Sequence, residues 1–161
     1  MGIYQCIADV LEYPDERLNA RLDACEAALG ARALAAFRAE AERVGVARLQ
    51  ELYASAFDMD AGCALYAGHH LFGADVRRSI FMACLAAQYR EAGFDAAPEL
   101  PDYLPAILRY VDRAPGAAVG VREELLSEVV LPAARRLAEA LDRRQHPYAP
   151  VLRALAQMLE S

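Results

Sequence analysis

The sequence predicts an all-α fold, a single domain over residues 1–161 built as a bundle of about eight or nine helices. Three observations predict this class. Alanine is abundant and all 17 basic residues are arginine, and both are strong helix formers. Apolar residues recur every three or four positions along most of the chain. No segment of useful length alternates apolar and polar residues, as a half-buried strand would.

The N-terminal third contains four predicted helices. Residues 3–11 have apolar positions at helical spacing, and Tyr13-Pro14-Asp15 ends this helix. A second helix begins at Asp15-Glu16, where acidic residues suit the helix dipole, and stops at Gly30. The next two helices cover residues 34–45 and 49–57.

The middle of the chain begins with a turn at 58–62, which contains two aspartates and a glycine. A short helix is predicted over about 63–72. A long one follows, from Ala74 or Asp75 to about Glu91, and its apolar positions include Val76, Ile80, Leu85 and Tyr89. Residues 94–102 are predicted as the longest loop of this region.

The stretch 99–105, Glu-Leu-Pro-Asp-Tyr-Leu-Pro, is predicted to be a rigid entry into a helix that ends near Ala114. Pro101 disfavours helix at the preceding residue, so the incoming chain is extended. Asp102 is a suitable N-cap, and Pro105 falls in the first turn, where its missing N–H costs little. Leu100 and Tyr103 are expected to dock the entry against the core.

The C-terminal third is predicted to contain a loop and two helices. Pro115-Gly116 and Gly120 indicate the loop. A long helix over about 121–144 contains Pro132, which should kink it near Val129. His146-Pro147 ends that helix, and residues 151–159 form the last one.

Charge and cysteine content limit the class of protein. The net charge of −6 and the pI near 5.1 argue against nucleic acid as the partner and are compatible with a basic peptide or a basic protein face. No run approaches a membrane span and no export signal is evident, so we expect a cytoplasmic protein. The four cysteines, Cys6, Cys25, Cys63 and Cys84, form no CxxC pair and are expected to be reduced and buried.

Motifs for catalysis are missing, so the sequence does not predict an enzyme or a cofactor of its own. The alternative from another class is a helical metal or redox protein that uses His69, His70, Cys63 and Cys84. Adjacent histidines on a helix point about 100° apart, which is unfavourable for gripping one metal ion. Cys63 lies six residues from His69, a spacing that does not stack two side chains on one helix face.

Aromatic residues concentrate in the middle of the chain and allow two interpretations. Most aromatic side chains on the helices of a domain this size are core. Tyrosines can also line a groove, because they offer an apolar body and a polar tip to a peptide. The residues concerned are Tyr53, Phe57, Tyr66, Phe72, Phe81, Tyr89, Phe94, Tyr103 and Tyr110.

Six motifs, in order along almost the whole chain, resemble those of the NarJ branch of the NarJ/TorD family, the assembly chaperones of molybdenum oxidoreductases. The most specific is 99–105, which is similar to the family signature E-L-P-D-x-L-P. The others are Leu11-Glu12-Tyr13-Pro14-Asp15, Tyr53 to Asp58, Leu65-Tyr66 to Gly73, Tyr89 to Gly93, and Pro147-Tyr148 to Leu152.

The resemblance implies an all-helical chaperone without catalysis, present as a monomer or a homodimer. It would bind the N-terminal peptide of the catalytic subunit of a molybdenum oxidoreductase, most simply respiratory nitrate reductase, and hold that subunit ready for cofactor insertion before membrane docking. Candidate peptide-binding residues on this basis are Tyr53, Phe57, Asp58, Tyr66, His69, His70, Arg78, Glu99, Leu100, Pro101, Asp102, Tyr103, Leu104 and Pro105.

Four departures from the family pattern bear on which enzyme is the client. Ala56 and Gly68 stand where the family usually has threonine, 73–79 lacks the first arginine and the final glycine of its motif, and Arg109 stands where a glutamate is usual. These departures leave room for a related molybdenum enzyme as client, of the selenate, chlorate, perchlorate or dimethyl sulfide type.

Overall fold

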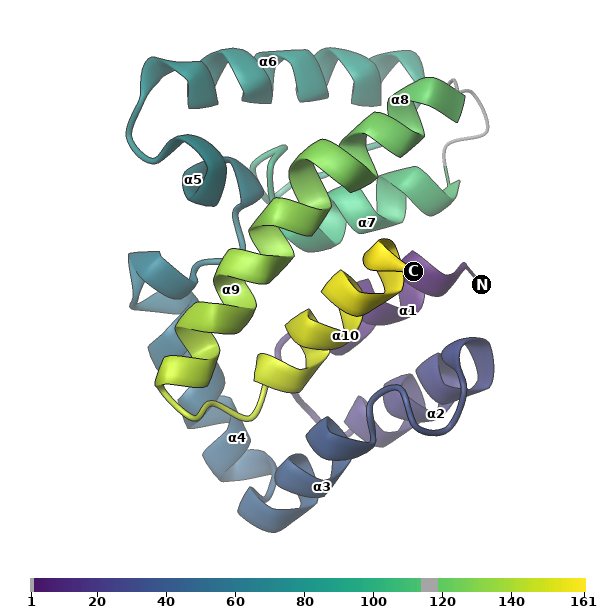
Figure 1. Cartoon of the computed structure of the whole chain (residues 1–161), viewed down its shortest axis with the longest axis vertical. Helices are drawn as coiled ribbons and strands as arrows, with labels where there is room; N and C mark the ends of the chain where they lie inside the picture. Colours follow the sequence, from purple (N-terminus) through teal and green to yellow (C-terminus); the bar gives the residue numbers. More distant parts are fainter. Residues whose placement is uncertain (1, 114–118) are drawn as a thin grey trace.

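The computed structural model describes residues 2–113 and 119–161, which fold into α-helices joined by short connections (Figure 1). The first half contains α1 (Ile3–Val10), α2 (Leu18–Leu29), α3 (Ala35–Val44), α4 (Val46–Tyr53), the π-helical turn η1 (Ala54–Asp58), the 3-10 turn η2 (Ala61–Cys63), α5 (Ala67–Phe72) and α6 (Val76–Glu91). The second half contains α7 (Leu104–Arg113), α8 (Val119–Glu124), the π-helical segment η3 (Leu125–Val130), α9 (Leu131–Arg143) and α10 (Ala149–Glu160). The predicted all-α class is confirmed.

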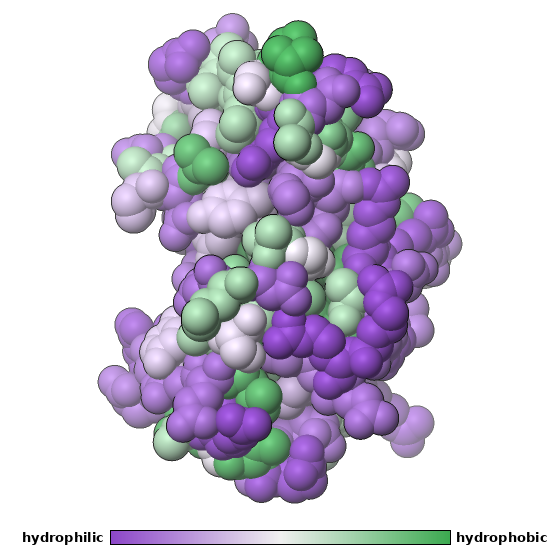
Figure 2. Space-filling view, turned by 90° about the vertical axis from the view of Figure 1, so that its left-hand side faces the viewer, coloured by the Kyte–Doolittle hydropathy of each residue, from purple (hydrophilic) through white to green (hydrophobic). Residues whose placement is uncertain are grey.

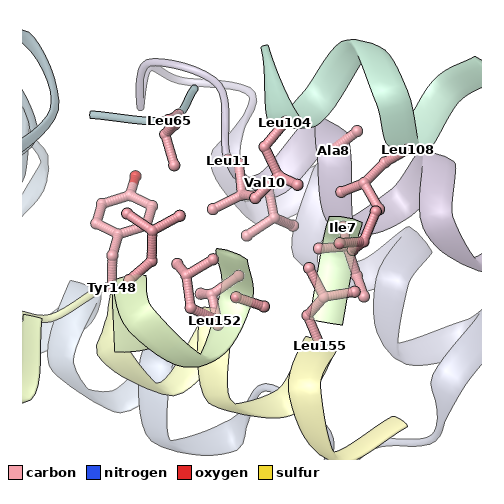
Figure 3. Close-up of a cluster of buried hydrophobic side chains, with 14 of the residues drawn as sticks. Ile7, Ala8, Val10, Leu11, Leu65, Leu104, Leu108, Tyr148, Leu152 and Leu155 are labelled. Carbon is pink, nitrogen blue, oxygen red and sulfur yellow. The ribbon is translucent and has the colours of Figure 1, made fainter. Parts of the chain in front are cut away.

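Helix α1 lies in the middle of the packing, against α2 on one side and α7 on another. Its side chains at Ile7, Ala8 and Val10 are fully buried, so the helix is apolar around most of its circumference. Leu108 of α7 and Leu155 of α10 point toward this helix in Figure 3. Helix α10 also packs along α9, so the last two helices of the chain lie side by side.

Tyr148 organises a second part of the core, just before α10. Its ring is fully buried and lies 4.6 Å from the ring of Phe37 and 5.4 Å from that of Phe57. Next to it, buried His146 accepts a hydrogen bond at Nδ1 from the N–H of Tyr148 (3.2 Å) and places Nε2 2.9 Å from the carbonyl of Leu52. A ring that accepts at Nδ1 and donates at Nε2 is neutral.

Val129, where a kink is predicted, lies within a π-helical segment just before Pro132. Residues 119–143 form one helical run in Figure 1, and its π-helical segment η3 ends two residues before this proline. A proline inside a helix removes one N–H and crowds the preceding turn, and a wider π turn relieves both effects. Gly120, predicted in a loop, lies instead within α8. The predicted loop residues Pro115-Gly116 lie outside the described part of the chain.

Two other local predictions are corrected. The helix expected from residue 63 begins only at Ala67, because residues 64–66 run extended and Tyr66 pairs with Tyr103 in an isolated antiparallel bridge. The second helix starts at Leu18 rather than Asp15, whose carboxylate accepts the N–H of Arg17 in the turn before it.

Exposure corrects a second set of predictions. Of the apolar positions predicted on α6, Leu85 and Tyr89 are buried, whereas Val76 and Ile80 are 70% and 60% exposed. Leu100 is 48% exposed and does not dock into the core. Of the four thiols, Cys84 is exposed, whereas the other three are buried as expected. Burial raises the pKa of Cys25 to about 12.

A search of the helices in 2–113 and 119–161 for one long and apolar enough to cross a bilayer finds none.

The buried histidines predict a pH-dependent stability. Burial lowers the pKa of His146 and of His70, so protonation is easier in the unfolded chain than in the folded one. Their contribution to folding is therefore fully present above about pH 7 and is lost as the pH falls through the unfolded value, about 6.5. Urea unfolding should give a free energy that rises from pH 5.5 to 7.5, with a shallower rise in His146→Gln. A flat profile in the wild type would contradict this assignment.

Candidate functional site

The stretch 99–105 is held against α5 by two backbone hydrogen bonds. The N–H of Leu104 donates to the carbonyl of Leu65 (2.7 Å), and the N–H of Ala67 donates to the carbonyl of Asp102 (2.8 Å). The phenol of Tyr89, from α6, donates to the carbonyl of Pro101 (2.7 Å). This proline-rich entry therefore has partners on both neighbouring helices.

A buried ion pair fastens the same stretch to α6. Asp102 is fully buried, and its carboxylate accepts hydrogen bonds from Nε of Arg78 (2.9 Å) and from the adjacent guanidinium nitrogen (3.4 Å). Two donors from one planar guanidinium fix the direction of the carboxylate. The prediction that Asp102 caps the next helix is wrong: α7 begins two residues later, and the carboxylate points to Arg78 instead.

Gly68 makes room for this ion pair. A β-carbon built at this position would lie 2.5 Å from Oδ2 of Asp102 and 3.1 Å from Cγ of Arg78. No side chain fits there without moving the pair. The glycine that departs from the family pattern is thus explained by close packing.

The surface above the ion pair is aromatic and polar. The rings of Tyr66 and Tyr103 lie 5.5 Å apart, and the Arg78 guanidinium lies 5.9 Å from the centre of the Tyr66 ring. The phenol of Tyr66 donates to Oε2 of Glu99 (2.6 Å). Burial, followed by this carboxylate, raises the pKa of Tyr66 to about 12, so the phenol keeps its proton at physiological pH.

The two histidines of α5 are half-buried and differ in their surroundings. Nε2 of His70 lies 2.6 Å from the carbonyl of Ala64, within the extended segment before the helix. The rings of His69 and His70 meet edge to face at 5.5 Å. Within 2–113 and 119–161, no three His, Cys, Asp or Glu side chains gather as they would to hold a metal ion.

A hollow of about 230 Å³ opens beside Glu99 and Tyr103. Phe94 and Tyr103 give it aromatic walls, and its carboxylates come from Glu12, Asp95 and Glu99. The only cation among its lining residues, Arg109, is already bonded to Glu12 (2.7 Å) and to Asp9 (3.0 Å). Negative charge therefore exceeds positive charge around an aromatic hollow, which we call the signature pocket.

The structure separates the sequence-predicted site residues into three groups. Exposed or half-buried positions around the signature stretch are Tyr66, His69, His70, Arg78, Glu99, Leu100, Pro101 and Tyr103. Buried positions, which face the core, are Tyr53, Phe57, Asp102, Leu104 and Pro105. Asp58 is exposed at the end of η1, and no hydrogen bond or ion pair joins it to the other candidates in the described ranges.

Three charged residues that line the signature pocket, Glu12, Asp95 and Arg109, are absent from the predicted site, whereas Phe94 is among the aromatic residues expected in a core or a groove. Glu12 lies in the Leu-Glu-Tyr-Pro-Asp motif, and Arg109 lies at a departure from the family pattern. Both positions could therefore be recognised as candidate site residues from the sequence. Nothing local in the sequence indicates that the end of α1 meets the loop after α6, because that contact depends on the packing of α1 against α7.

Figure 2 shows a face on which hydrophobic side chains occur in separate small groups among charged ones. A broad apolar patch, of the kind that marks a large permanent interface, is not seen on this face.

The family model described as nitrate reductase delta subunit matches residues 18–154, which is most of the chain. No curated protein matches the chain.

Removing Arg78 should be costly, because it leaves a buried carboxylate without its partner. Arg78→Ala is expected to lower the free energy of unfolding by about 3 kcal/mol. The neighbouring Arg77 offers a matched control, since its bond to Asp75 is exposed, and Arg77→Ala should cost no more than about 1 kcal/mol. Urea unfolding of both variants measures the difference, and equal losses would contradict the role given to Arg78.

A methyl group at position 68 should also destabilise the fold. Gly68→Ala pushes on the Asp102–Arg78 pair and is expected to cost about 1–3 kcal/mol. Gly120→Ala is the matched control: its β-carbon meets open space within a helix, so it should leave stability unchanged or raise it by up to about 1 kcal/mol. A thermal melt of Gly68→Ala at or above the wild-type midpoint would refute the close-packing explanation.

Proposed function

The chain belongs to the nitrate reductase delta subunit family, and we propose that it binds the N-terminal peptide of a nitrate reductase catalytic subunit and holds that subunit ready for molybdenum cofactor insertion. The family consists of non-catalytic assembly chaperones of nitrate reductase, so this chain is not an enzyme and its partner is the catalytic subunit. We further propose that the peptide binds near residues 99–105 and that binding takes place in the cytoplasm.

The observation that carries the proposal is the signature pocket. It combines two aromatic walls with carboxylates at Glu12, Asp95 and Glu99. Aromatic side chains offer a rigid apolar surface, and carboxylates favour a cation that approaches along it. Such a pocket suits an apolar side chain that is followed or preceded by a basic residue.

Exposed residues around the pocket extend this surface. Leu100 presents an apolar side chain to solvent, and Tyr66 keeps a polar tip beside Glu99. An amphipathic helix places its apolar side chains on one face, so it can cover Leu100 and reach the pocket at the same time. The net charge of −6 on the chain adds long-range attraction for a basic peptide.

The buried candidates support the site from below. Asp102 and Leu104 contact no solvent, and the Arg78 pair and the backbone bonds to α5 fix the position of Glu99 and Tyr103 above them. A binding surface with fixed side chains loses less entropy when a peptide binds. These residues are therefore proposed to position the peptide site.

Calorimetric titration tests the proposal. The probe is a synthetic peptide from the N-terminus of a nitrate reductase catalytic subunit, and micromolar or tighter binding that a scrambled peptide lacks is expected. Glu99→Gln should weaken binding by about three- to fivefold, the range of one exposed ion pair. Glu139→Gln removes the same charge from the exposed face of α9, outside the pocket, and should leave the affinity unchanged.

Two results would contradict the proposal. If the wild-type protein binds neither this peptide nor the corresponding peptides of related molybdenum enzymes, the proposed role of the leader is wrong. If Glu99→Gln and Glu139→Gln bind equally well, the peptide lies elsewhere on the molecule.

A further inference from the structure

A second hollow, of about 360 Å³, lies between the start of α2, the end of α3 and the start of α4. Its apolar lining includes Leu18, Leu49 and Val46, and Val46 is 48% exposed. Carboxylates of Glu16 and Glu42 stand at its edge. We call this hollow the α2–α4 pocket. It shares no lining residue with the signature pocket.

The acidic side chains of the α2–α4 pocket are available to a partner. Glu16 and Glu42 form no salt bridge with any residue of 2–113 or 119–161, whereas Asp15 is bonded to Arg17. Glu42 lies in the last turn of α3, where the helix dipole disfavours a negative charge. An approaching cation would therefore relieve an unfavourable charge at this position.

The two pockets are joined by a short, fixed segment of chain. Glu12 lines the signature pocket and Asp15 lines the α2–α4 pocket. Three peptide units separate these residues, so their α-carbons are at most about 11 Å apart. Between them, Tyr13 is 49% exposed and offers its ring as a bridge.

Hydrogen bonds hold this connecting segment in place. Arg21 donates to the carbonyl of Tyr13 (3.2 Å), and the side-chain amide of Gln50 donates to the carbonyl of Pro14 (2.9 Å). The phenol of Tyr53 donates to the carbonyl of Leu11 (2.7 Å), and its ring meets Tyr13 edge to face at 5.6 Å. The distance between the two pockets is thus fixed by the fold.

We propose that the signature pocket, Tyr13 and the α2–α4 pocket form one continuous track that binds a single amphipathic segment at two points. The occupant is the basic N-terminal segment of the catalytic subunit, so this inference rests on the proposed function. Each pocket takes an apolar side chain, and the carboxylates beside it take an adjacent Arg or Lys. In a helix, residues seven positions apart are separated by about 10.5 Å, so a helical segment of a few turns is long enough to pass along the Glu12–Asp15 segment and reach both pockets.

The track predicts that recognition depends on length as well as composition. The probe is the peptide used above, at about 16 residues, together with a version shortened by about two helical turns. The double variant Glu16→Gln/Glu42→Gln should weaken binding of the long peptide by about three- to tenfold. Val46→Ser should weaken it as well, since it removes apolar surface from the pocket. The short peptide should respond to changes in one pocket only.

Matched controls separate this inference from the proposed function. Glu139→Gln removes a carboxylate and Val119→Ser removes an exposed valine, both outside the two pockets, and neither should affect binding. If Glu99→Gln weakens binding while the α2–α4 pocket variants behave like these controls, the track is refuted and the proposed function stands. If the wild-type protein does not bind the long peptide, both are refuted.

Discussion

The bond between Arg78 and Asp102 determines where the candidate site lies. It joins α6 to the stretch before α7, together with the bond from Tyr89 to the carbonyl of Pro101. Asp102 has no access to water, so its charge is tolerable only with this guanidinium beside it. The bridge between Tyr66 and Tyr103 involves the residue next to Asp102, and Glu99, three residues before it, lines the signature pocket.

The same pair explains why so many residues of one motif are inaccessible. In the stretch 99–105, Glu99 and Leu100 face solvent, while Asp102, Leu104 and Pro105 are buried. A motif of this kind combines a scaffold with a surface. The buried members fix the backbone, and the exposed members are free to meet a partner.

Much of the fold could be predicted because its causes are local. The spacing of apolar residues located most helices. Asp75, one of the two residues predicted to begin the long helix, caps α6 through a bond from the N–H of Arg77. The ion-pair partner of Asp102 could not be predicted from local sequence. An aspartate before a helix normally caps it, and only the fold reveals an arginine 24 residues earlier in the chain as its partner. The extended conformation of residues 64–66 has the same kind of cause, since Leu65 accepts from the N–H of Leu104 and Tyr66 pairs with Tyr103.

The candidate site was predictable only in part, on similar grounds. Glu99 and Tyr103 belong to a recognisable motif, but Glu12 and Asp95 join them through the packing of α1 and α7. Tyr53 and Phe57 were attractive aromatic candidates, yet helical periodicity cannot distinguish a groove from a core. Their rings pack around Tyr148, a residue almost a hundred positions away.

The four cysteine thiols differ in their access to reagents in solution. Cys6, Cys25 and Cys63 are buried, and burial raises the pKa of each thiol, so all three react slowly with electrophiles. Cys84 is exposed on α6. A maleimide dye added to the native protein would therefore attach at one position without any mutation. Because α6 carries Arg78, that dye would report on the helix that anchors the candidate site while a partner binds and leaves.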